Sequence, residues 1–346
     1  MVVGAAGRLG LSCLARHTVT ASPEVRAALP AAIETTCPVC RGPMQQGLVG
    51  VRDPQSGDAF DVVRCPRCHL GITVPAPEDL EPYYGEHYYG GRHWLTRRYC
   101  AWRRMRVIKQ TTRGTEPSTL VDIGCGDGSF LLEARQAGWT VLGTEVNNRI
   151  PSPGLEIWGS LDDLKARAPF GCITLWHSLE HLRNPIQALA DLTEMLVPGG
   201  TFVVAVPDSA GYQARLFGAD WLHLDVPRHL YHFSLPSLRA ELDRAGLEVV
   251  RVWHHELEYD WFGWIQSALN RIMPRPNILF DALTRRPRRV SRLCLTANVI
   301  LGLLWLIPAF AAIVVTTWMS QGGTLIIAAR RPVDRNGALE HGLHEG

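Results

Sequence analysis

The sequence predicts an α/β fold in which helices cover both faces of a mostly parallel sheet. From residue 119 onward, apolar strand-like runs alternate with helical patterns. A glycine-rich turn joins the first of these runs to the first helix. The chain has 346 residues, of which 46% are apolar, so it can bury a sizeable core. We expect a small cysteine-rich module before this core and an apolar helical insertion before its last strand.

The predicted elements follow one another in regular alternation. Strands are expected at 119–124, 140–146, 155–159, 171–178, 201–207, 247–253 and 324–330. Helices are expected after Gly91 and at 129–138, 184–200 and 234–246. Pro185 suits a first helical turn, and the Pro-Gly-Gly at 198–200 is expected to end that helix.

The predicted domain boundaries follow shifts in composition. They give a disordered leader (1–30), a zinc-ribbon-like module (31–75), a helical linker (76–113), a core (114–260), an apolar insertion (261–320), the last core strand (321–333) and a tail (334–346). The net charge of +2 gives no field that would attract nucleic acid, so we expect no nucleic-acid partner.

Four of the nine cysteines form two CxxC pairs. Cys37 and Cys40 are followed, after 24 residues, by Cys65 and Cys68. Two such pairs can place four thiolates tetrahedrally around one zinc ion, with the intervening residues forming a hairpin. A closed site of four cysteines is normally structural, so we assign this site to folding or docking rather than catalysis. The cysteine pattern favours a reducing compartment and a metal over disulfides.

The glycine-rich turn is a candidate ligand loop. Gly124, Gly126 and Gly128 lie between a predicted strand and helix, where the backbone can pass close to a ligand. The GxGxG spacing matches neither the dinucleotide fingerprint nor the phosphate loop. Asp122 precedes the loop, and Glu145 ends the next strand, where a carboxylate can accept hydrogen bonds from ribose hydroxyls.

At these residues the chain resembles the class I S-adenosylmethionine-dependent methyltransferases. The resemblance spans about 119–256 and 321–331, and it implies a Rossmann-like sheet of seven strands whose last strand is antiparallel and lies beside the fifth. It also implies that Asp122 and the 124–128 loop, Cys125 included, hold the methionine part of S-adenosylmethionine. Glu145 would bind the ribose, and Ser160 and Leu161 would contact the adenine.

The cysteine pairs and the segment "DLEPYYGEHYY" resemble one bacterial branch of this family. Its members modify sugars, polysaccharide precursors or lipids, and zinc-bearing sugar C-methyltransferases share the N-terminal pattern. One departure is Gly171, which stands where the family usually has aspartate. That position is mostly structural.

The segment "HSLEHL" places His177, Glu180 and His181 at the carboxyl end of the fourth predicted strand of the core. It can form a loop under the cofactor, with His177 near the sulfonium, or it can bind a metal. The ubiquinone-pathway O-methyltransferases resemble this stretch and have Glu-x-x-Glu-His there. Here His177 replaces the first carboxylate, which weakens the case for magnesium.

A second histidine-rich segment, 221–234, follows the fifth predicted strand of the core. Methyl transfer needs a positioned acceptor and can need a base, a task that suits histidine. We name His229 or His232 as the candidate base, with Asp225 to orient it and Arg228 to hold a phosphate or carboxylate. The alternative is structural, with these side chains satisfied in a packed loop.

Residues 293–319 contain no charged side chain. One crossing of a bilayer would separate the last strand from its partner at 247–253, and Pro308 is expected to split the run into pieces shorter than the ~20 residues that a crossing needs. We expect peripheral membrane contact through 261–319, aided by the arginines before it and by Trp261 and Trp264. Internal packing, a homodimer interface and a true span are the alternatives.

These features predict a methyltransferase on the cytoplasmic face of the cell membrane. Its expected cofactors are S-adenosylmethionine and zinc, and its expected acceptor is an oxygen or carbon of a lipid-linked sugar or similar amphiphile. Two alternatives are a soluble small-molecule O-methyltransferase, of quinone or sugar-nucleotide type, and a non-catalytic scaffold that binds the cofactor.

Overall fold

The computed structural model describes residues 36–84, 94–112, 118–146, 154–284, 286 and 290–333. The predicted leader and tail lie outside these residues. The chain divides into two compact units. The ribbon unit comprises Met1–Arg92, Asp208–Ser234 and His255–Thr324, and the sheet unit comprises His93–Pro207, Leu235–His254 and Leu325–Gly346.

The sheet unit is built on a seven-stranded sheet with the order β10-β11-β8-β7-β4-β5-β6. Its strands are β4 (Thr119–Ile123), β5 (Thr140–Thr144), β6 (Glu156–Trp158), β7 (Phe170–Trp176), β8 (Leu196–Pro207), β10 (Glu248–Trp253) and β11 (Thr324–Arg330). Strands β4 to β8 pair in parallel, whereas β11 runs antiparallel to β10 and lies between β10 and β8. The predicted Rossmann-like sheet is confirmed, with its last strand beside the fifth.

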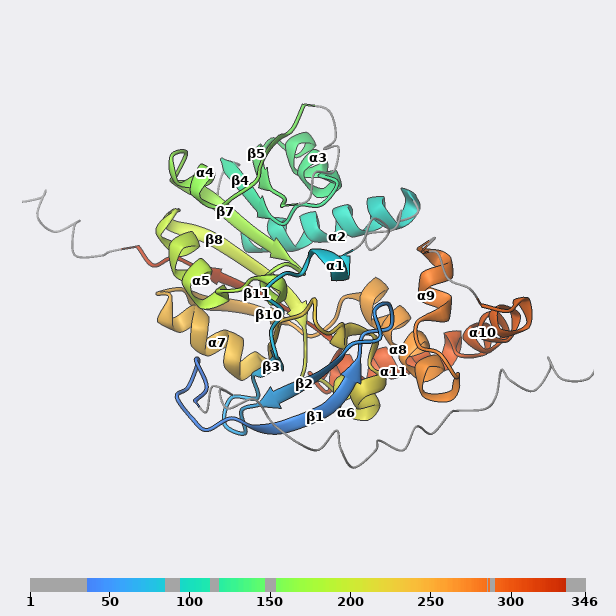
Figure 1. Ribbon diagram of the computed structural model, residues 1–346. Helices are drawn as coiled ribbons and strands as arrows, with labels where there is room; N and C mark the ends of the chain where they lie inside the picture. Colours follow the sequence, from blue (N-terminus) through green and yellow to red (C-terminus); the bar gives the residue numbers. More distant parts are fainter. Residues whose placement is uncertain are drawn as a thin grey trace, which may run out of the picture. The chain divides into compact units, whose positions relative to one another are not determined.

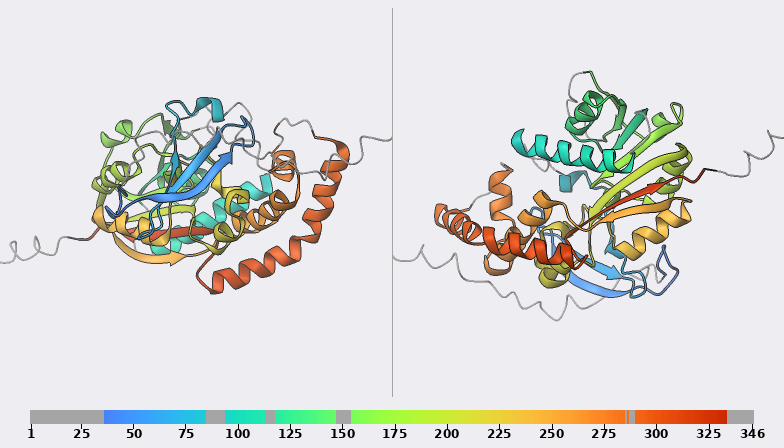
Figure 2. Two further views of the ribbon diagram at one scale, coloured as in Figure 1. Left: turned by 60° about the horizontal axis from the view of Figure 1, so that its bottom comes forward. Right: turned by 180° about the vertical axis from the view of Figure 1, so that it is seen from behind.

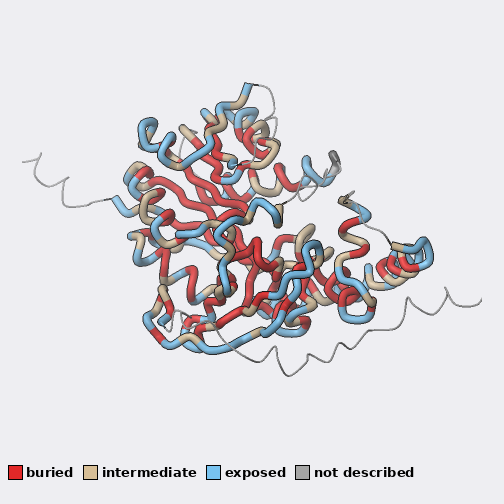
Figure 3. The backbone as a smooth tube through the Cα atoms, in the orientation of Figure 1, coloured by how far each residue is buried: buried red, intermediate tan, exposed pale blue. Residues whose placement is uncertain are grey.

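Helices cover both faces of this sheet (Figure 1). They are α2 (Trp94–Thr111), α3 (Ser129–Gln136), α4 (Asp162–Lys165), the 3-10 helix Leu179–His181, α5 (Pro185–Glu194) and α7 (Leu235–Arg244). Helix α3 buries Phe130, Leu131 and Ala134, which share one helical face. The strands β4, β7, β8 and β11 are mostly buried (Figure 3), whereas β6 and β10 contain no fully buried residue.

One predicted helix end is wrong. Helix α5 begins at Pro185 as expected but ends at Glu194, and the Pro-Gly-Gly at 198–200 lies inside β8. Between Phe170 and Cys172 the register of β7 with β8 shifts, and Gly199 takes a left-handed φ of 79°. Its amide donates to the Arg331 carbonyl at 2.8 Å. The glycines therefore form a bulge, because only glycine adopts this conformation without strain.

The ribbon unit carries an antiparallel sheet with the order β1-β2-β3-β9. Its strands are β1 (Gln45–Arg52), β2 (Ala59–Arg64), β3 (Gly71–Val74) and β9 (Tyr231–His232). The hairpin β1–β2 lies between the two cysteine pairs, as predicted. Strand β9 comes from the histidine-rich segment, and the sequence analysis did not predict it.

Helices complete the ribbon unit. They are α1 (Glu81–Tyr84), α6 (Tyr212–Phe217), the 3-10 helices Gly218–Asp220 and Leu222–Leu224, α8 (Leu257–Ile272), α9 (Ile278–Leu283), α10 (Arg292–Leu304) and α11 (Leu306–Trp318). Helix α8 is largely buried and packs in the hydrophobic core of this unit. Trp264 is only 5% exposed. The expected role of Trp264 at a membrane interface is therefore wrong, because its ring is enclosed by protein.

The units also differ from the predicted boundaries. The core was expected to run from 114 to 260 without interruption, but 208–234 and 255–260 belong to the ribbon unit. The reason is hydrogen bonding that periodicity does not reveal. For example, the Thr73 amide of β3 donates to the Leu230 carbonyl at 3.0 Å.

The apolar run forms two helices that meet at Trp305 with a bend of 49° (Figure 2). The break was expected at Pro308, which instead lies in the first turn of α11. A proline is tolerated there because the first helical amides have no carbonyl partner within the helix. Among the described residues no single helix is long and apolar enough to cross a membrane, whereas α10 and α11 together meet that criterion.

Candidate functional site

The predicted cofactor residues meet at one edge of the sheet. Strands β4, β5 and β7 are parallel neighbours, with Asp122 opposite Gly143 on one side and Thr174 on the other. Their carboxyl ends therefore bring the glycine loop, Glu145 and His177 to the same edge. In doubly wound sheets this edge is where ligands bind.

The glycine loop needs glycine for two reasons. Gly124, Gly126 and Gly128 have left-handed φ angles of 72°, 58° and 74°, a region that side chains rarely adopt. In addition, a Cβ at Gly124 would lie 2.8 Å from the Ser178 Cβ, and one at Gly128 would collide with Leu155. The loop therefore presents bare backbone at the strand ends.

Glu145 is already aimed at this loop. Its Oε2 accepts a hydrogen bond from the Gly126 amide at 2.9 Å. Its own amide donates to the Trp158 carbonyl at 2.9 Å, which joins the end of β5 to the end of β6. A half-buried carboxylate in this position can accept hydrogen bonds from a pair of hydroxyls.

Asp122 is buried beneath the loop, with 1% of its surface exposed. Its Oδ1 accepts a hydrogen bond from the Thr174 hydroxyl at 2.6 Å. Burial raises the pKa of Asp122 to about 7, and the positive charge of Arg104 partly opposes that shift. Asp122 can therefore exchange a proton near neutral pH when a cation binds beside it.

Arg104 is a site residue that the sequence analysis missed. It lies on α2, and its guanidinium carbon is 5.1 Å from the centre of the Trp176 ring. The Arg104 Nε and the Trp176 Nε1 are buried and have no hydrogen-bond partner among the described residues. Such donors beside Asp122 suit a ligand that carries a carboxylate. The sequence signal is weak, because α2 carries several arginines and its periodicity does not say which one points inward.

His177 directly follows β7 and has a left-handed φ of 55°, which is uncommon for a residue with a side chain. Its amide donates to the Ala205 carbonyl at 2.9 Å, and its Nδ1 lies 3.6 Å from Glu180 Oε1. The next residue, Ser178, donates to the Ile123 carbonyl at 2.7 Å. His177 is thus held next to the glycine loop, and its role as cofactor ligand or catalytic residue stays a prediction.

Three other predicted residues contribute differently. The Cys125 thiol is buried, and a Cβ at Gly143 would lie 2.8 Å from its sulfur, so only its backbone faces the loop. Ser160 and Leu161 follow β6 near Glu145, and the Ser160 hydroxyl donates to Asp163 Oδ2 at 2.9 Å. Their predicted adenine contact stays a prediction. A Cβ at Gly171 would meet the Ser118 hydroxyl, so an aspartate there would require the Ser118 side chain to move.

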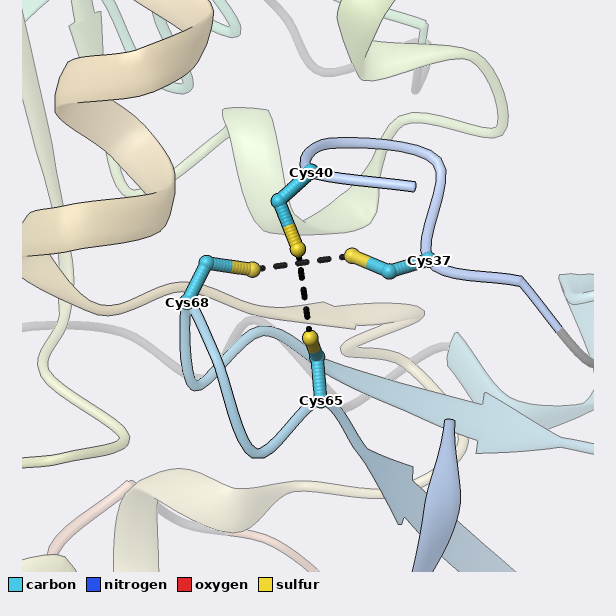
Figure 4. Close-up of side chains that lie close together, drawn as sticks. All are labelled: Cys37, Cys40, Cys65 and Cys68. Atoms are coloured by element: carbon cyan, nitrogen blue, oxygen red, sulfur yellow. Dashed lines mark hydrogen bonds between the residues drawn. The ribbon is translucent and has the colours of Figure 1, made fainter. Parts of the chain in front are cut away.

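The four module cysteines converge in the ribbon unit (Figure 4). Their sulfurs all lie within 4.8 Å of one another, and the two closest pairs, Cys37–Cys68 and Cys40–Cys65, are 3.5 and 3.4 Å apart. A tetrahedron with zinc–sulfur bonds of about 2.3 Å has edges of about 3.8 Å. The cluster therefore fits one zinc ion.

The two cysteine turns share one backbone geometry. The residue after the second cysteine, Arg41 or His69, has a left-handed φ of 58° or 60°. Its amide donates to the carbonyl of the first cysteine, Cys37 or Cys65, at 3.0 or 2.9 Å. Two matching turns that face each other are what a four-thiolate metal site requires.

His232 lies in strand β9 of the ribbon sheet, opposite Gly71 of β3. Its Nε2 lies 2.9 Å from the Thr73 hydroxyl, which in turn donates to the His229 carbonyl at 2.7 Å. Since that hydroxyl has one hydrogen, the His232 Nε2 must carry a proton and donate. Burial holds the pKa of His232 well below its usual value. This environment favours the structural alternative for His232.

His229 differs in its tautomer. Its Nδ1 lies 2.9 Å from the His223 carbonyl, which can only accept, so Nδ1 carries the proton and the neutral ring has its lone pair at Nε2. The two candidate bases are therefore opposite tautomers: the neutral ring has its lone pair at Nε2 in His229 and at Nδ1 in His232. The catalytic role of His229 stays a prediction.

Arg228 does not have the role expected for it. Its guanidinium is 1% exposed and donates to Asp53 at 2.7 Å, to Asp225 at 2.6 Å and to the Tyr83 carbonyl at 3.0 Å. The prediction that it holds a phosphate or carboxylate of the acceptor is wrong, because two aspartates already occupy it. The sequence feature that could indicate this ion pair is Asp53, which lies in the turn between β1 and β2.

Comparison with known proteins agrees with this fold. Residues 92–252 match a family model described as "Methyltransferase domain". A ubiquinone biosynthesis O-methyltransferase of Maricaulis maris (strain MCS10) is 30% identical over 156 residues, which cover 40% of this chain and 61% of that protein. A second, from Azoarcus sp. (strain BH72), is 27% identical over 157 residues, which cover 40% of this chain and 67% of that protein.

A tRNA U34 carboxymethyltransferase of Ectopseudomonas mendocina (strain ymp) is 26% identical over 146 residues, covering 38% of this chain and 45% of that protein. Among solved structures, a SAM-dependent methyltransferase from Archaeoglobus fulgidus aligns with a TM-score of 0.43 at 18% identity, over 68% of this chain and 94% of that one. The chain spans 61% and 67% of the length of the two ubiquinone biosynthesis relatives. Residues 92–252 therefore resemble a methyltransferase domain, in agreement with the Rossmann-like sheet of the sheet unit.

Proposed function

We propose that this protein transfers the methyl group of S-adenosylmethionine to an oxygen or carbon of an amphiphilic acceptor, such as a lipid-linked sugar. The observation that carries the proposal is the bare glycine loop between Asp122 and Glu145, with the Glu145 carboxylate 2.9 Å from the Gly126 amide. When bound, the cofactor supplies an electrophilic methyl on a sulfonium. The chain's own task is to hold both reactants in line.

The residues at this edge suit the parts of the cofactor. Glu145 would exchange the Gly126 amide for the ribose hydroxyls. Asp122 would face the methionine ammonium, and Arg104, whose Nε is buried without a partner among the described residues, would face its carboxylate. His177, beside the loop, would lie near the sulfonium.

Two observations support an amphiphilic acceptor. Two relatives that match about 40% of this chain are named for ubiquinone biosynthesis, and a quinone with an apolar tail is an amphiphile. The helices α10 and α11 expose many apolar side chains. The relatives' names equally favour a soluble quinone-type O-methyltransferase as the second candidate, in which the apolar helices would mediate dimerisation.

The test is isothermal titration of S-adenosylmethionine and its demethylated product into wild-type protein and Glu145→Ala. Loss of charge-assisted hydrogen bonds of about 1.5–3 kcal/mol predicts binding roughly 10 to 150 times weaker in the variant. Glu133→Ala, which removes another half-buried carboxylate, on α3, is the matched control. A folded wild-type protein that binds neither compound would contradict the proposal. Binding without turnover on any acceptor would favour the non-catalytic scaffold.

We propose further that Cys37, Cys40, Cys65 and Cys68 bind a structural zinc ion. Their convergence to within 4.8 Å supports this assignment. We expect one zinc per chain by elemental mass spectrometry, and less in Cys65→Ser, whereas Cys172→Ser in the sheet unit should keep the full amount. Equal zinc in both variants, or none in the wild type, would contradict the assignment.

A further inference from the structure

We infer that the outward face of α10 and α11 docks on an anionic lipid bilayer, with both helices lying flat in the interface. The inference deepens the proposed function, since it says where an amphiphilic acceptor would be met. Lipid binding and cofactor binding nevertheless involve different residues, so either can fail alone.

From Val299 to Trp318 the outward face of the two helices is formed mainly by exposed apolar side chains. Ile307 is 83% exposed, Leu304 68%, Leu303 61% and Val314 55%. From 293 to 319 the sequence has no Asp, Glu, Lys or Arg. The exposed faces of helices in water normally carry such residues, and a contiguous apolar patch of this kind marks an interaction surface.

The opposite face is fixed to the ribbon unit. Ala309, Ile313 and Thr316 are buried. The Trp261 indole of α8 donates to the Leu306 carbonyl at 3.0 Å, and its ring meets Phe310 edge-on at 6.1 Å. These contacts define which side of α11 is available and hold it in place.

The geometry suits flat docking better than crossing. Each helix has 13 residues, which span about 20 Å, whereas the hydrocarbon core is about 30 Å thick. A single crossing would place β10 and β11 on opposite sides of the membrane, but these strands are hydrogen-bonded to each other. An in-plane pair buries the apolar face without breaking that sheet.

Charge and aromatic placement favour an anionic bilayer over a second copy of the chain. The sequence has five arginines between 284 and 292, directly before the apolar run. Arg286 lies 3.8 Å from Asp281 and its side chain is only 10% exposed, whereas Arg292 at the start of α10 is exposed. Anionic headgroups would neutralise this charge, whereas a symmetric dimer across the same face would bring two basic runs toward one interface. Trp318, 85% exposed at the end of α11, is the residue type that bilayer interfaces select.

The experiment is flotation of the full chain with vesicles of phosphatidylcholine, with or without phosphatidylglycerol. We expect binding to the mixed vesicles and roughly a hundredfold weaker partition for Ile307→Gln/Trp318→Gln, because two inserted side chains are lost. Arg292→Gln should weaken binding about fivefold. The control Val49→Gln/Val250→Gln changes two exposed valines elsewhere and should bind as wild type.

Several outcomes would overturn the inference. The inference of bilayer docking would be contradicted if wild-type protein did not bind the mixed vesicles. It would also be contradicted if the double variant bound them as fully as wild type. A lipid-free dimer that Ile307→Gln/Trp318→Gln converts to monomer would assign the face to a second copy. Titration of S-adenosylmethionine into the same samples separates this failure from failure of the proposed function.

Discussion

The cofactor edge of the sheet unit and the histidine-rich segment of the ribbon unit differ in whether their buried polar groups have hydrogen-bond partners. At the edge, the Arg104 Nε and the Trp176 Nε1 are buried without partners among the described residues, and the glycine loop exposes its backbone. In the segment, Arg228 and His232 are bonded to aspartates and to the Thr73 hydroxyl. Sites that await a ligand keep unused donors, whereas structural networks use theirs.

The difference shows that a high density of reactive residues in the sequence does not by itself identify a catalytic or ligand-binding site. Residues 221–234 contain three histidines, an aspartate and an arginine. Strand β9 places His232 in the ribbon sheet opposite Gly71, and Arg228 fastens this segment to the β1–β2 turn through Asp53. Most of this chemistry therefore holds the segment onto the metal module.

Replacing Arg228 should have the largest effect on stability. Arg228→Ala leaves Asp53, whose side chain has no exposed surface, as a buried charge without its guanidinium. We expect unfolding free energy to fall by about 3–5 kcal/mol, measured by urea denaturation. Cofactor affinity of the remaining folded protein should not change.

A double variant sharpens this comparison. Arg228→Met/Asp53→Leu removes the fully buried pair and leaves only Asp225, which is 19% exposed. It should recover much of the lost stability, since buried ion pairs can be replaced by apolar side chains. If Arg228→Ala instead left stability intact and abolished activity on an acceptor, Arg228 would belong to the acceptor site after all.

A smaller effect is expected at the two candidate bases. His232→Leu removes the donor to Thr73 and should lower stability by about 1–3 kcal/mol, by the same urea assay. His229→Gln, an amide able to keep the bond to the His223 carbonyl, should lower stability less and should reduce turnover once an acceptor is known. Equal loss of stability with no effect on turnover in either variant would remove both histidines from catalysis.

Much of the fold could be predicted because it follows from periodicity and from glycine and proline positions. The strands of the sheet, the start of α5 at Pro185 and the span of β11 are local consequences of sequence. The CxxC spacing likewise predicted the convergence of four thiols. Each of these features depends on residues that lie close together in the chain or in one repeating pattern.

The parts that could not be predicted depend on contacts between distant residues. Pairing of β9 with β3 joins residues about 160 positions apart, as in the contact of His232 with Gly71. The inward direction of Arg104 depends on how α2 is rotated against the sheet, and burial of Trp264 depends on the helices that enclose α8. No local pattern carries this information.

The smallest expected effect concerns the pH dependence of cofactor binding, which arises at Asp122. Burial raises its pKa to about 7, so protonation stabilises the unliganded fold; that contribution is complete below the ordinary carboxyl pKa of 3.8 and is lost as the pH rises through about 7. The cofactor ammonium needs the ionised form, so affinity for S-adenosylmethionine should be about tenfold weaker at pH 6 than at pH 8, with a proton released on binding at pH 6. Titrations in buffers of different ionisation enthalpy would measure that proton.

Asp260 in the ribbon unit provides the control for this prediction. Its pKa is also raised by burial to about 7, and it contributes to the pH dependence of stability without touching the glycine loop. Asp122→Asn should therefore abolish the proton release but keep most of the pH dependence that Asp260 gives to unfolding; proton release that persists in this variant would place the titrating group elsewhere.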